Sequence, residues 1–362
     1  MNIYKKIHTH INIRTQDTDY IIGTDLLGNI PRGNFLLLSS KSVFEIHGKK
    51  ITGSLKKTGR EIVVSIIDDG EDSKNFSNLN EIISPFIQTN LNKNTILIAL
   101  GGGVVTDIGG FIGTILIRGI KTIFIPTTLL AQIDASIGGK NGMNYKIGDS
   151  IYKNMMGTIT QPSLVISDID LLKTLPRKEW TSGLGELVKY TIGWGIPSID
   201  QLNAIKTPRR WSKASVQVEE LAKTISSCQK LKLDVIEKDP HDTLHVRDSL
   251  NFGHTIGHAV EVLSKGILSH GESVAIGLNA ASLMSLKMGF ISLGIHQENE
   301  TLISSLGLPT KIKNISQKDI LNHIKFDKKG GRFVLLKSRH RLQTDVVVPQ
   351  AIINQTLDEI IL

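Results

Sequence analysis

The sequence predicts an α/β protein in which a parallel sheet with covering helices is followed by a mostly helical domain. In the first half, short β-branched or aliphatic runs alternate with segments of helical spacing, a pattern typical of a helix-covered parallel sheet. After about residue 177, apolar residues instead recur every three or four positions. We therefore place the domain boundary near residue 180 and expect one domain over 1–178 and another over 179–362.

Individual segments follow from the same patterns. The predicted strands of the first domain are FLLLSS (35–40), EIVVSII (61–67), NTILIALGGG (94–103), KTIFIP (121–126) and SLVISD (163–168). Helical spacing marks SNLNEIISPFIQTNL in the first half, then RKEWTSGLGELVKYTIGW, SVQVEELAKTISSCQKLKLDVIE and ESVAIGLNAASLMSLKMGF in the second. Near the end, RFVLLK (332–337) and DVVVP (345–349) predict a small hairpin before a terminal helix.

Composition excludes several classes of protein. The chain has 362 residues, 40% of them hydrophobic and 21% charged, as in ordinary globular domains. Its longest uncharged apolar stretch, 108–117, is too short for a bilayer span, and the N-terminus lacks a signal peptide's apolar core. The single cysteine, Cys228, suits a reducing compartment, so we expect a cytoplasmic protein. The net charge of +8 is spread along the chain, which argues against a nucleic-acid surface.

A glycine-rich turn follows the predicted strand at 94–103. In ALGGGVVTDIGGFIG, glycines let the backbone approach a ligand, and the helix N-terminus that follows offers free N–H groups to a phosphate. A tight, closely packed turn without a ligand explains the glycines equally well. IPTTLLAQIDASIGGK then adds polar groups after the next strand, at the edge where parallel sheets bind ligands, and favours a binding site.

Two histidines four residues apart, His254 and His258, lie in LNFGHTIGHAVE, which reads as helical. They share one helix face, where both could point at one metal ion, although a helical histidine pair more often packs in a core or faces solvent. Thr255 follows the first, so the HExxH zinc-protease motif is absent. His270 begins a further predicted helix and can close on the same site. Open zinc sites commonly combine two histidines with a carboxylate, and spacing alone does not choose that carboxylate.

The chain contains, in this order, the motifs GGGVVTDIGGFIG, PTTLLAQIDASIGGK, SGLGELVKY, LNFGHTIGHAVE and HGESVAIG. As an ordered set, these motifs resemble those of the 3-dehydroquinate synthase family, a branch of the sugar-phosphate cyclases. The resemblance runs from about residue 68 to 335. It implies a Rossmann-like NAD-binding domain followed by a helical metal- and substrate-binding domain, in an enzyme of the shikimate pathway. It also implies a homodimer without nucleic-acid or membrane partners.

The resemblance implies particular roles for particular residues. The metal ligands, for Zn²⁺ or Co²⁺, would be Glu186, His254 and His270. The catalytic groups would be His258, Lys140, Asn251, Lys189 and Asp134. Phosphate, carboxylate and hydroxyl groups of the substrate would contact Arg118 (from the other subunit), Lys140, Asn154, Lys189, Lys232, Arg247, Asn251, His258, and Lys328 or Lys329. NAD would lie against Asp69, Gly70, Glu71, Lys74, Gly103, Val104, Val105, Thr106, Asp107, Thr127, Thr128, Lys140, Lys153, Leu171, Leu172, Lys173 and Thr174.

The implied reaction converts 3-deoxy-D-arabino-heptulosonate 7-phosphate to 3-dehydroquinate and phosphate. NAD takes a hydride from a secondary alcohol and later returns it, with phosphate elimination, ring opening and an aldol closure completing the turnover. Lys232 and Arg247 suit a substrate carboxylate and favour this activity over that of cyclases acting on sugar phosphates without one. Another sugar-phosphate cyclase and a metal-dependent alcohol dehydrogenase remain the alternatives.

The chain departs from the family pattern in its loops. Ser39 and Ser40 stand where an acidic residue usually follows the first strand, and the segment 141–152 is longer than usual, with consequences for NAD affinity and for the placement of Lys153 and Asn154. Asp242 stands in for a glutamate before Arg247.

Overall fold

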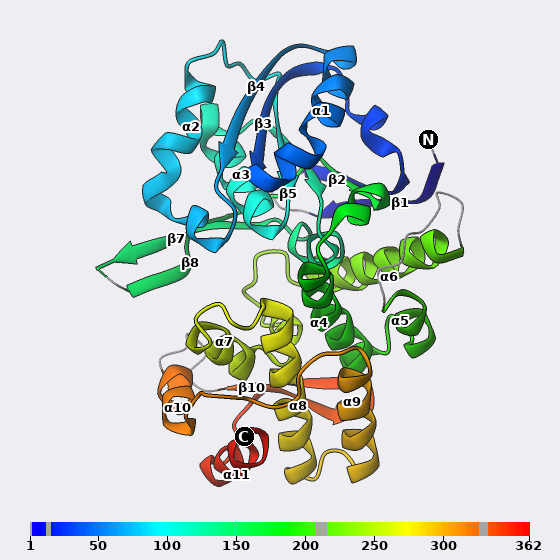
Figure 1. Cartoon of the computed structure of the whole chain (residues 1–362), viewed down its shortest axis with the longest axis vertical. Coiled ribbons are helices and arrows are strands. Elements are labelled where there is room, and N and C mark those ends of the chain that lie inside the picture. Colours follow the sequence, from blue (N-terminus) through cyan, green and yellow to red (C-terminus); the bar gives the residue numbers. More distant parts are fainter. Residues whose placement is uncertain (1, 12–15, 149, 207–215, 326–331) are drawn as a thin grey trace. The chain divides into compact units, whose positions relative to one another are not determined.

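The computed structural model describes residues 2–11, 16–148, 150–206, 216–325 and 332–362. Its contacts divide the chain into two compact units (Figure 1). The first contains Met1–Leu175 and Arg210–His241, and the second contains Pro176–Arg209 and Asp242–Leu362. The sequence predicted two domains with a single boundary at residue 178, and this division stays a prediction. The structural units differ from it because the chain returns to the first unit after residue 209.

The first unit is built on a seven-stranded sheet of order β1-β2-β9-β6-β5-β3-β4. Strands β2, β9, β6, β5, β3 and β4 run parallel, and only β1 is antiparallel to its neighbour. The strands are β1 (Asn2–Ile11), β2 (Gln16–Thr24), β3 (Gly33–Ser40), β4 (Gly59–Ile67), β5 (Thr95–Gly101), β6 (Lys121–Pro126) and β9 (Leu164–Asp168). The five strands predicted between residues 35 and 168 are therefore confirmed as the parallel part of the sheet.

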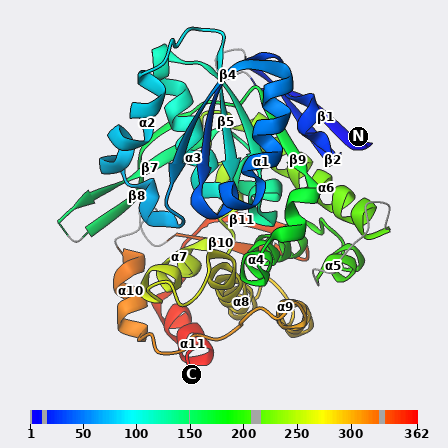
Figure 2. The same cartoon turned by 45° about the horizontal axis from the view of Figure 1, so that its top comes forward.

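Helices cover both faces of this sheet (Figure 2). Alternation along β3 shows why: Leu36 and Leu38 enter one core, and Phe35 and Leu37 enter the other. The first core is closed by residues of α2 (Leu79–Ile87), α3 (Gly103–Ile115) and α6 (Val216–Lys238), and the second by residues of α1 (Lys41–Thr58) and the 3-10 turn η1 (Leu26–Asn29). Both faces being buried accounts for the continuous aliphatic runs in the central strands.

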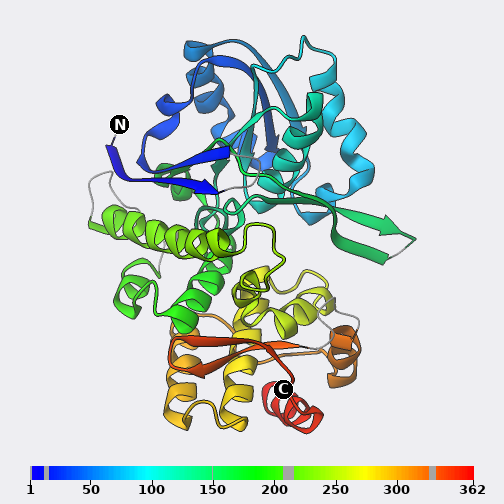
Figure 3. The ribbon, with the colours of Figure 1, turned by 180° about the vertical axis from the view of Figure 1, so that it is seen from behind.

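Helix α6 contacts β1 and β2, and Figure 3 shows it beside them. Its helical spacing was predicted, but it belongs to the sheet-containing unit although its residues lie beyond 178. Amphipathic spacing identifies a helix without specifying which surface covers its apolar face.

A two-stranded ribbon, β7 (Lys140–Ile147) and β8 (Ser150–Ile159), belongs to the same unit and was not predicted (Figure 1). Its exposed large side chains include Tyr145, Ile147, Ile151 and Tyr152.

The second unit is mostly helical, with one small hairpin. Its helices are α4 (Arg177–Trp194), α5 (Ile199–Ile205), α7 (His254–Leu263), α8 (His270–Lys287), α9 (Leu293–Ser305), α10 (Gln317–Lys325) and α11 (Gln350–Ile360). The hairpin pairs β10 (Phe333–Ser338) with β11 (Arg341–Val346). The second hairpin strand was predicted at 345–349 and lies earlier, because Pro349 is the N-cap of α11 and the pairing follows the tight turn after Ser338. Among the described residues, no helix is long and apolar enough to cross a membrane.

Candidate functional site

The glycine-rich turn lies where β5 ends and α3 begins. Gly102 is the N-cap of α3, and its carbonyl accepts a hydrogen bond from the Thr106 amide at 3.1 Å. A Cβ added to Gly103 would lie 3.1 Å from the Cβ of Ala135, so the first turn of α3 approaches the neighbouring turn closely. The helix N-terminus thus exposes backbone N–H groups at a position with little room for a side chain, as a phosphate-binding turn requires.

The DGEDSK segment follows β4 and reaches α3. Gly70 has φ +100°, and the Lys74 ammonium, which is 4% exposed, forms an ion pair with the Asp107 carboxylate. Glu71 Oε1 accepts a hydrogen bond from the Asn144 side chain at 2.8 Å. Of the predicted cofactor residues, Lys74 therefore connects this segment to Asp107 of α3, and Glu71 connects it to the β7–β8 ribbon.

Asp69 supplies an acidic group beside the serines that end β3. Its Oδ1 accepts a hydrogen bond from Ser42 Oγ at 2.7 Å. Burial raises the pKa of Asp69, but hydrogen bonds from Ser42 and Ser40 outweigh it, so the pKa lies below its ordinary value. Ser39 is committed elsewhere, because its hydroxyl donates to the Leu100 carbonyl at 2.8 Å. A carboxylate is thus present at this edge of the sheet, supplied by β4 and not by β3.

The turn after β6 presents two threonines. Thr128 Oγ1 accepts from the Ala131 amide at 3.1 Å. The buried Thr127 Oγ1 has no hydrogen-bond partner within the described part of the chain, which leaves a hydroxyl available to a ligand.

The predicted run 171–174 forms the end of the 3-10 segment η6 (Ile169–Thr174). Leu171 and Leu172 are 2% exposed, so their side chains pack in the unit and only their backbone can face a ligand. Thr174 Oγ1 lies 2.9 Å from His47 Nε2, and Lys173 pairs with Asp170 at 2.7 Å.

Asp134 and Lys232 form another ion pair in the first unit. Lys232 Nζ on α6 contacts the Asp134 carboxylate and donates to the Asp134 carbonyl at 2.7 Å. Asp134 lies in the π-helical turn η5 (Ala131–Ala135), and the buried Gln229 of α6 donates to the Gln132 carbonyl of that turn at 2.8 Å. Helix α6 therefore holds a predicted catalytic group and a predicted carboxylate-binding group together.

Four further predicted residues are exposed in the first unit. Lys140 begins β7, and Lys153 and Asn154 lie in β8, where the Asn154 amide donates to Asn144 Oδ1 at 2.9 Å. Arg118 follows α3 with φ +58° and an exposed side chain.

In the second unit, three helices bring Glu186, His254 and His270 together, one residue from each of α4, α7 and α8. Glu186 Oε1 lies 3.1 Å from His270 Nε2 and 3.3 Å from His254 Nε2. One ligand atom from each residue lies within 4.8 Å of the others, so the three can hold one ion. This is the arrangement expected for a two-histidine, one-carboxylate zinc site.

Glycines explain why α4 and α8 approach so closely. A Cβ added to Gly185 would lie 2.2 Å from the Gly271 carbonyl oxygen, and one added to Gly271 would lie 1.9 Å from the Ser182 carbonyl oxygen. The two backbones are therefore in direct contact, and the residues that follow and precede these glycines, Glu186 and His270, meet beside that contact. In the motifs GLGE and HGE, a glycine stands next to each ligand. Because glycine has no side chain, the two helices can approach closely enough for Glu186 and His270 to meet.

The outer nitrogens of both histidines are also hydrogen-bonded. His254 Nδ1 lies 3.1 Å from the Phe252 carbonyl, and His270 Nδ1 lies 2.9 Å from Glu261 Oε2. When Nδ1 donates in each case, Nε2 is left with a lone pair toward the site, as metal-bound histidines require. The donor set and its surroundings thus fit a zinc ion.

Electrostatics in this group favour a bound cation. Burial raises the pKa of Glu186, but the charge on Lys189, 2.5 Å away, and the neighbouring His254 hold it well below its ordinary value. Burial lowers the pKa of His270, but hydrogen bonds to Glu186 and Glu261 outweigh this and raise it to about 10. Without a metal, a protonated His270 can therefore donate a hydrogen bond to each of the two carboxylates, Glu186 and Glu261.

Of the remaining predicted residues of the second unit, His258 lies next to this group. The His258 ring is edge-on to that of His254, with centroids 5.0 Å apart. Arg247 is 3% exposed, with Nε 3.9 Å from Asp242 Oδ1, and the Asn251 side chain donates to the Asp248 carbonyl at 3.3 Å. Lys328 and Lys329 lie outside the described residues.

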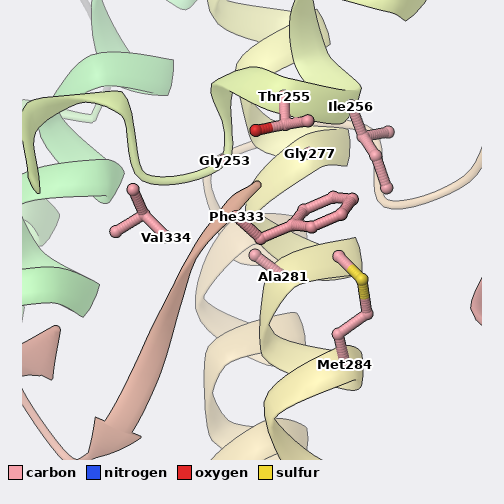
Figure 4. Close-up of a pocket in the computed structure, with 8 residues that line it drawn as sticks. All are labelled: Gly253, Thr255, Ile256, Gly277, Ala281, Met284, Phe333 and Val334. Carbon is pink, nitrogen blue, oxygen red and sulfur yellow. The ribbon is translucent and has the colours of Figure 1, made fainter. Parts of the chain in front are cut away.

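Glu261 was not predicted from the sequence. It follows His254 by seven residues and His258 by three on the same helix, so its position on their face of α7 was a detectable signal. A small pocket in the second unit is lined by Gly253, Thr255, Ile256, Gly277, Ala281, Met284, Phe333 and Val334 (Figure 4). It holds no charged side chain and none of the predicted residues, and we assign it to packing between α7, α8 and β10.

Comparison with known families extends these observations. The family described as 3-dehydroquinate synthase N-terminal matches residues 64–182, and that described as 3-dehydroquinate synthase C-terminal matches residues 183–330. A 3-dehydroquinate synthase of Alkaliphilus metalliredigens is 34% identical over 351 residues, covering 94% of this chain and 96% of that protein. One from Buchnera aphidicola subsp. Baizongia pistaciae is 40% identical over 295 residues, covering 81% of each chain.

Solved structures share the fold at lower identity. A 2-deoxy-scyllo-inosose synthase complexed with carbaglucose-6-phosphate, NAD+ and Co2+ aligns with a TM-score of 0.85 at 22% identity, covering 98% of this chain and 100% of that one. A 2-epi-5-epi-valiolone synthase from Streptomyces hygroscopicus subsp. jinggangensis with NAD+ and Zn2+ aligns with a TM-score of 0.82 at 22% identity, covering 95% and 96%. A glycerol dehydrogenase from Schizosaccharomyces pombe aligns with a TM-score of 0.65 at 16% identity, covering 98% and 90%. The predicted α/β fold class is thereby confirmed.

Proposed function

This chain belongs to the 3-dehydroquinate synthase family, and we propose that it converts 3-deoxy-D-arabino-heptulosonate 7-phosphate to 3-dehydroquinate and phosphate. It would be a phosphate-eliminating carbon–oxygen lyase of the shikimate pathway that depends on NAD and a divalent metal. The observation that carries the proposal is the convergence of Glu186, His254 and His270 from three helices, with His258 beside them.

Zinc is the metal that the donor set favours, with cobalt as a substitute, and Glu186, His254 and His270 would hold it. When bound, it would polarise the substrate hydroxyl that is oxidised and the carbonyl that replaces it. NAD is the cofactor that the glycine-rich turn suits, and it would accept and return one hydride in each turnover.

The residues around the metal group would handle protons and orientation. His258, whose imidazole is exposed beside His254, is suited to moving a proton at a substrate hydroxyl. Lys189 would hold the Glu186 carboxylate in its charged form, because its ammonium lies 2.5 Å from Glu186 Oε2. Asn251 would donate to a substrate hydroxyl through its side-chain amide.

Cationic side chains and one neutral amide, that of Asn154, would bind the two anionic ends of the substrate. Lys232 and Arg247 would hold the carboxylate, and Lys140, Asn154, Arg118 and one of Lys328 or Lys329 would contact the phosphate. Asp134, paired with Lys232, would keep that lysine charged and oriented.

The cofactor residues would lie along the carboxyl edge of the sheet. Gly103 to Asp107 would meet the pyrophosphate with backbone amides, and Asp69, Gly70, Glu71 and Lys74 would line the same edge. Thr127 and Thr128, Lys140 and Lys153, and the run 171–174 would complete the contact with NAD.

The proposal includes a cytoplasmic homodimer. The β7–β8 ribbon has exposed apolar side chains, among them Tyr145 and Tyr152, and these support a subunit interface on the ribbon. Arg118 would reach the phosphate of the partner subunit's substrate, which its exposed side chain permits.

The test is phosphate release from the heptulosonate phosphate with NAD and zinc, while NADH absorbance is recorded. Phosphate release that chelation abolishes and zinc restores, without net NADH, supports the cyclase. His254→Ala should lose this activity, whereas His8→Ala, which changes an exposed histidine of β1, should keep it. Stoichiometric NADH accumulation would contradict the proposal and indicate a dehydrogenase, and a zinc-loaded protein that releases no phosphate would also contradict it.

A further inference from the structure

Glu261 contacts a predicted metal ligand without being one of the three residues that share the central position. Its Oε2 lies 2.9 Å from Nδ1 of His270, on the side of the ring opposite the Nε2 that faces Glu186. The Glu261 side chain is 21% exposed, so water only partly competes for the contact. The contact joins α7, which carries Glu261, to α8, which carries His270.

The two histidines are held by different kinds of acceptor. His254 Nδ1 lies against a backbone carbonyl within its own segment, Phe252 O at 3.1 Å, which no side-chain substitution removes. His270 depends on a side chain from another helix. A carboxylate acceptor polarises the imidazole more strongly than a carbonyl does and makes its opposite nitrogen a better donor to a metal.

We propose that Glu261 is a positioning residue: by accepting a hydrogen bond from Nδ1–H of His270, it selects the tautomer whose Nε2 carries a lone pair, and it fixes the ring toward the metal. The inference rests on the proposed metal site, and it assigns to α7 two tasks: it supplies one ligand, His254, and orients another.

A local alternative exists in the cap of α8. Ser269 and Glu272 form a capping box around His270, in which Glu272 Oε2 accepts from the Ser269 amide at 2.8 Å. If this cap alone oriented His270, Glu261 would be dispensable. The two glutamates therefore make a matched pair of variants, both near His270, of which only Glu261 contacts its ring.

The experiment measures zinc affinity by competition with a chromophoric chelator, in the full chain without substrate. Glu261→Ala should weaken zinc binding about 10- to 100-fold. Glu261→Gln, whose amide oxygen still accepts from Nδ1–H but carries no charge, should recover part of that loss. Glu272→Ala should leave zinc affinity near that of the wild type, because it removes the cap and keeps the ring contact.

Unchanged affinity in Glu261→Ala would overturn the inference, and so would an equal loss in Glu272→Ala. Far-ultraviolet circular dichroism and thermal unfolding of the metal-free variants confirm that folded proteins are being compared. Absence of zinc binding by the wild-type protein would instead contradict the proposed metal site itself, so the two failures are distinguishable. Visible spectra of the cobalt-substituted proteins give a second readout, since a reoriented His270 alters the ligand field and a merely weakened helix cap does not.

Discussion

Glu186 and Lys189 form a buried ion pair one turn apart on α4, with Lys189 Nζ 2.5 Å from Glu186 Oε2 and both side chains 2% exposed. The other carboxylate oxygen of Glu186 faces His254 and His270. One carboxylate is thus shared between the Lys189 ammonium and the predicted metal position, and the charge of Lys189 helps to hold the pKa of Glu186 well below its ordinary value.

Lys189→Met should destabilise the metal-free protein by about 3 kcal/mol or more, because it leaves a buried carboxylate without its cation. Zinc should recover part of this loss, since the ion supplies positive charge on the other side of Glu186. Urea unfolding with and without zinc measures both effects. Lys223→Met is the matched control: Lys223 also pairs with a glutamate three residues away, Glu220, but at an exposed position where its loss should be barely detectable. Equal effects of the two substitutions would contradict the interpretation.

Gly103→Val should weaken NAD binding tenfold or more, equivalent to about 1.4 kcal/mol. A side chain at this position meets Ala135, so either the first turn of α3 or the η5 turn must move. Titration of the protein with NAD by calorimetry measures the loss. Gly53→Val, in the exposed face of α1 where an added Cβ meets nothing within 4 Å, should leave NAD affinity unchanged. Wild-type affinity in Gly103→Val would show that NAD does not use this turn.

Lys232→Met should raise KM for the heptulosonate phosphate by about 10-fold or more with a smaller change in kcat, because a carboxylate contact made in the ground state is lost. Binding of a substrate analogue without the carboxylate should change far less. The comparison variant is Lys230→Met, two residues earlier on α6 and exposed. A fall in kcat with constant KM would instead assign Lys232 to the chemical step.

The free energy of unfolding should fall on acidification in a way that depends on His296. This residue is 7% exposed, with Nδ1 3.1 Å from Ser282 Oγ, and burial lowers its pKa below 6.5. Because the folded pKa is the lower one, the unfolded chain binds more protons, so the contribution is present above pH 6.5 and is lost as pH falls through the folded value. His296→Gln should give a shallower decline between pH 7 and pH 5 in denaturant titrations. Identical slopes in the two proteins would contradict this assignment.

Helix α4 illustrates what the sequence predicts well. The segment 177–194 was predicted as a helix from its apolar spacing, and α4 spans Arg177–Trp194. Its start is marked by Pro176, which is the N-cap, and its end by Gly195 with φ +72°. Local signals of this kind act within the segment itself and need no knowledge of its partners.

The β7–β8 ribbon and the metal-site carboxylate Glu186 are features that local sequence signals did not predict. Strands β7 and β8 carry no clear alternation, and their pairing, such as Tyr145 opposite Tyr152, is set between two segments that each look irregular alone. Likewise, spacing placed His254 and His258 on one face but did not select Glu186, which the family resemblance named. The structure brings Glu186 to His270 through the backbone contact at Gly185 and Gly271, a long-range relationship that no single motif contains.

The discontinuity of the first unit constrains how the protein is synthesised. Leu233 and Ile236 of α6 pack in the same core cluster as Tyr20 of β2, yet they are translated after residues 176–209 of the other unit. A nascent chain that has emerged only to residue 175 therefore has all seven strands of the sheet but lacks the helix that completes this core. The first unit lacks α6 until residue 241 has left the ribosome, and a gene fragment cut at residue 175 would encode a sheet whose β1 and β2 lack the helix that contacts them.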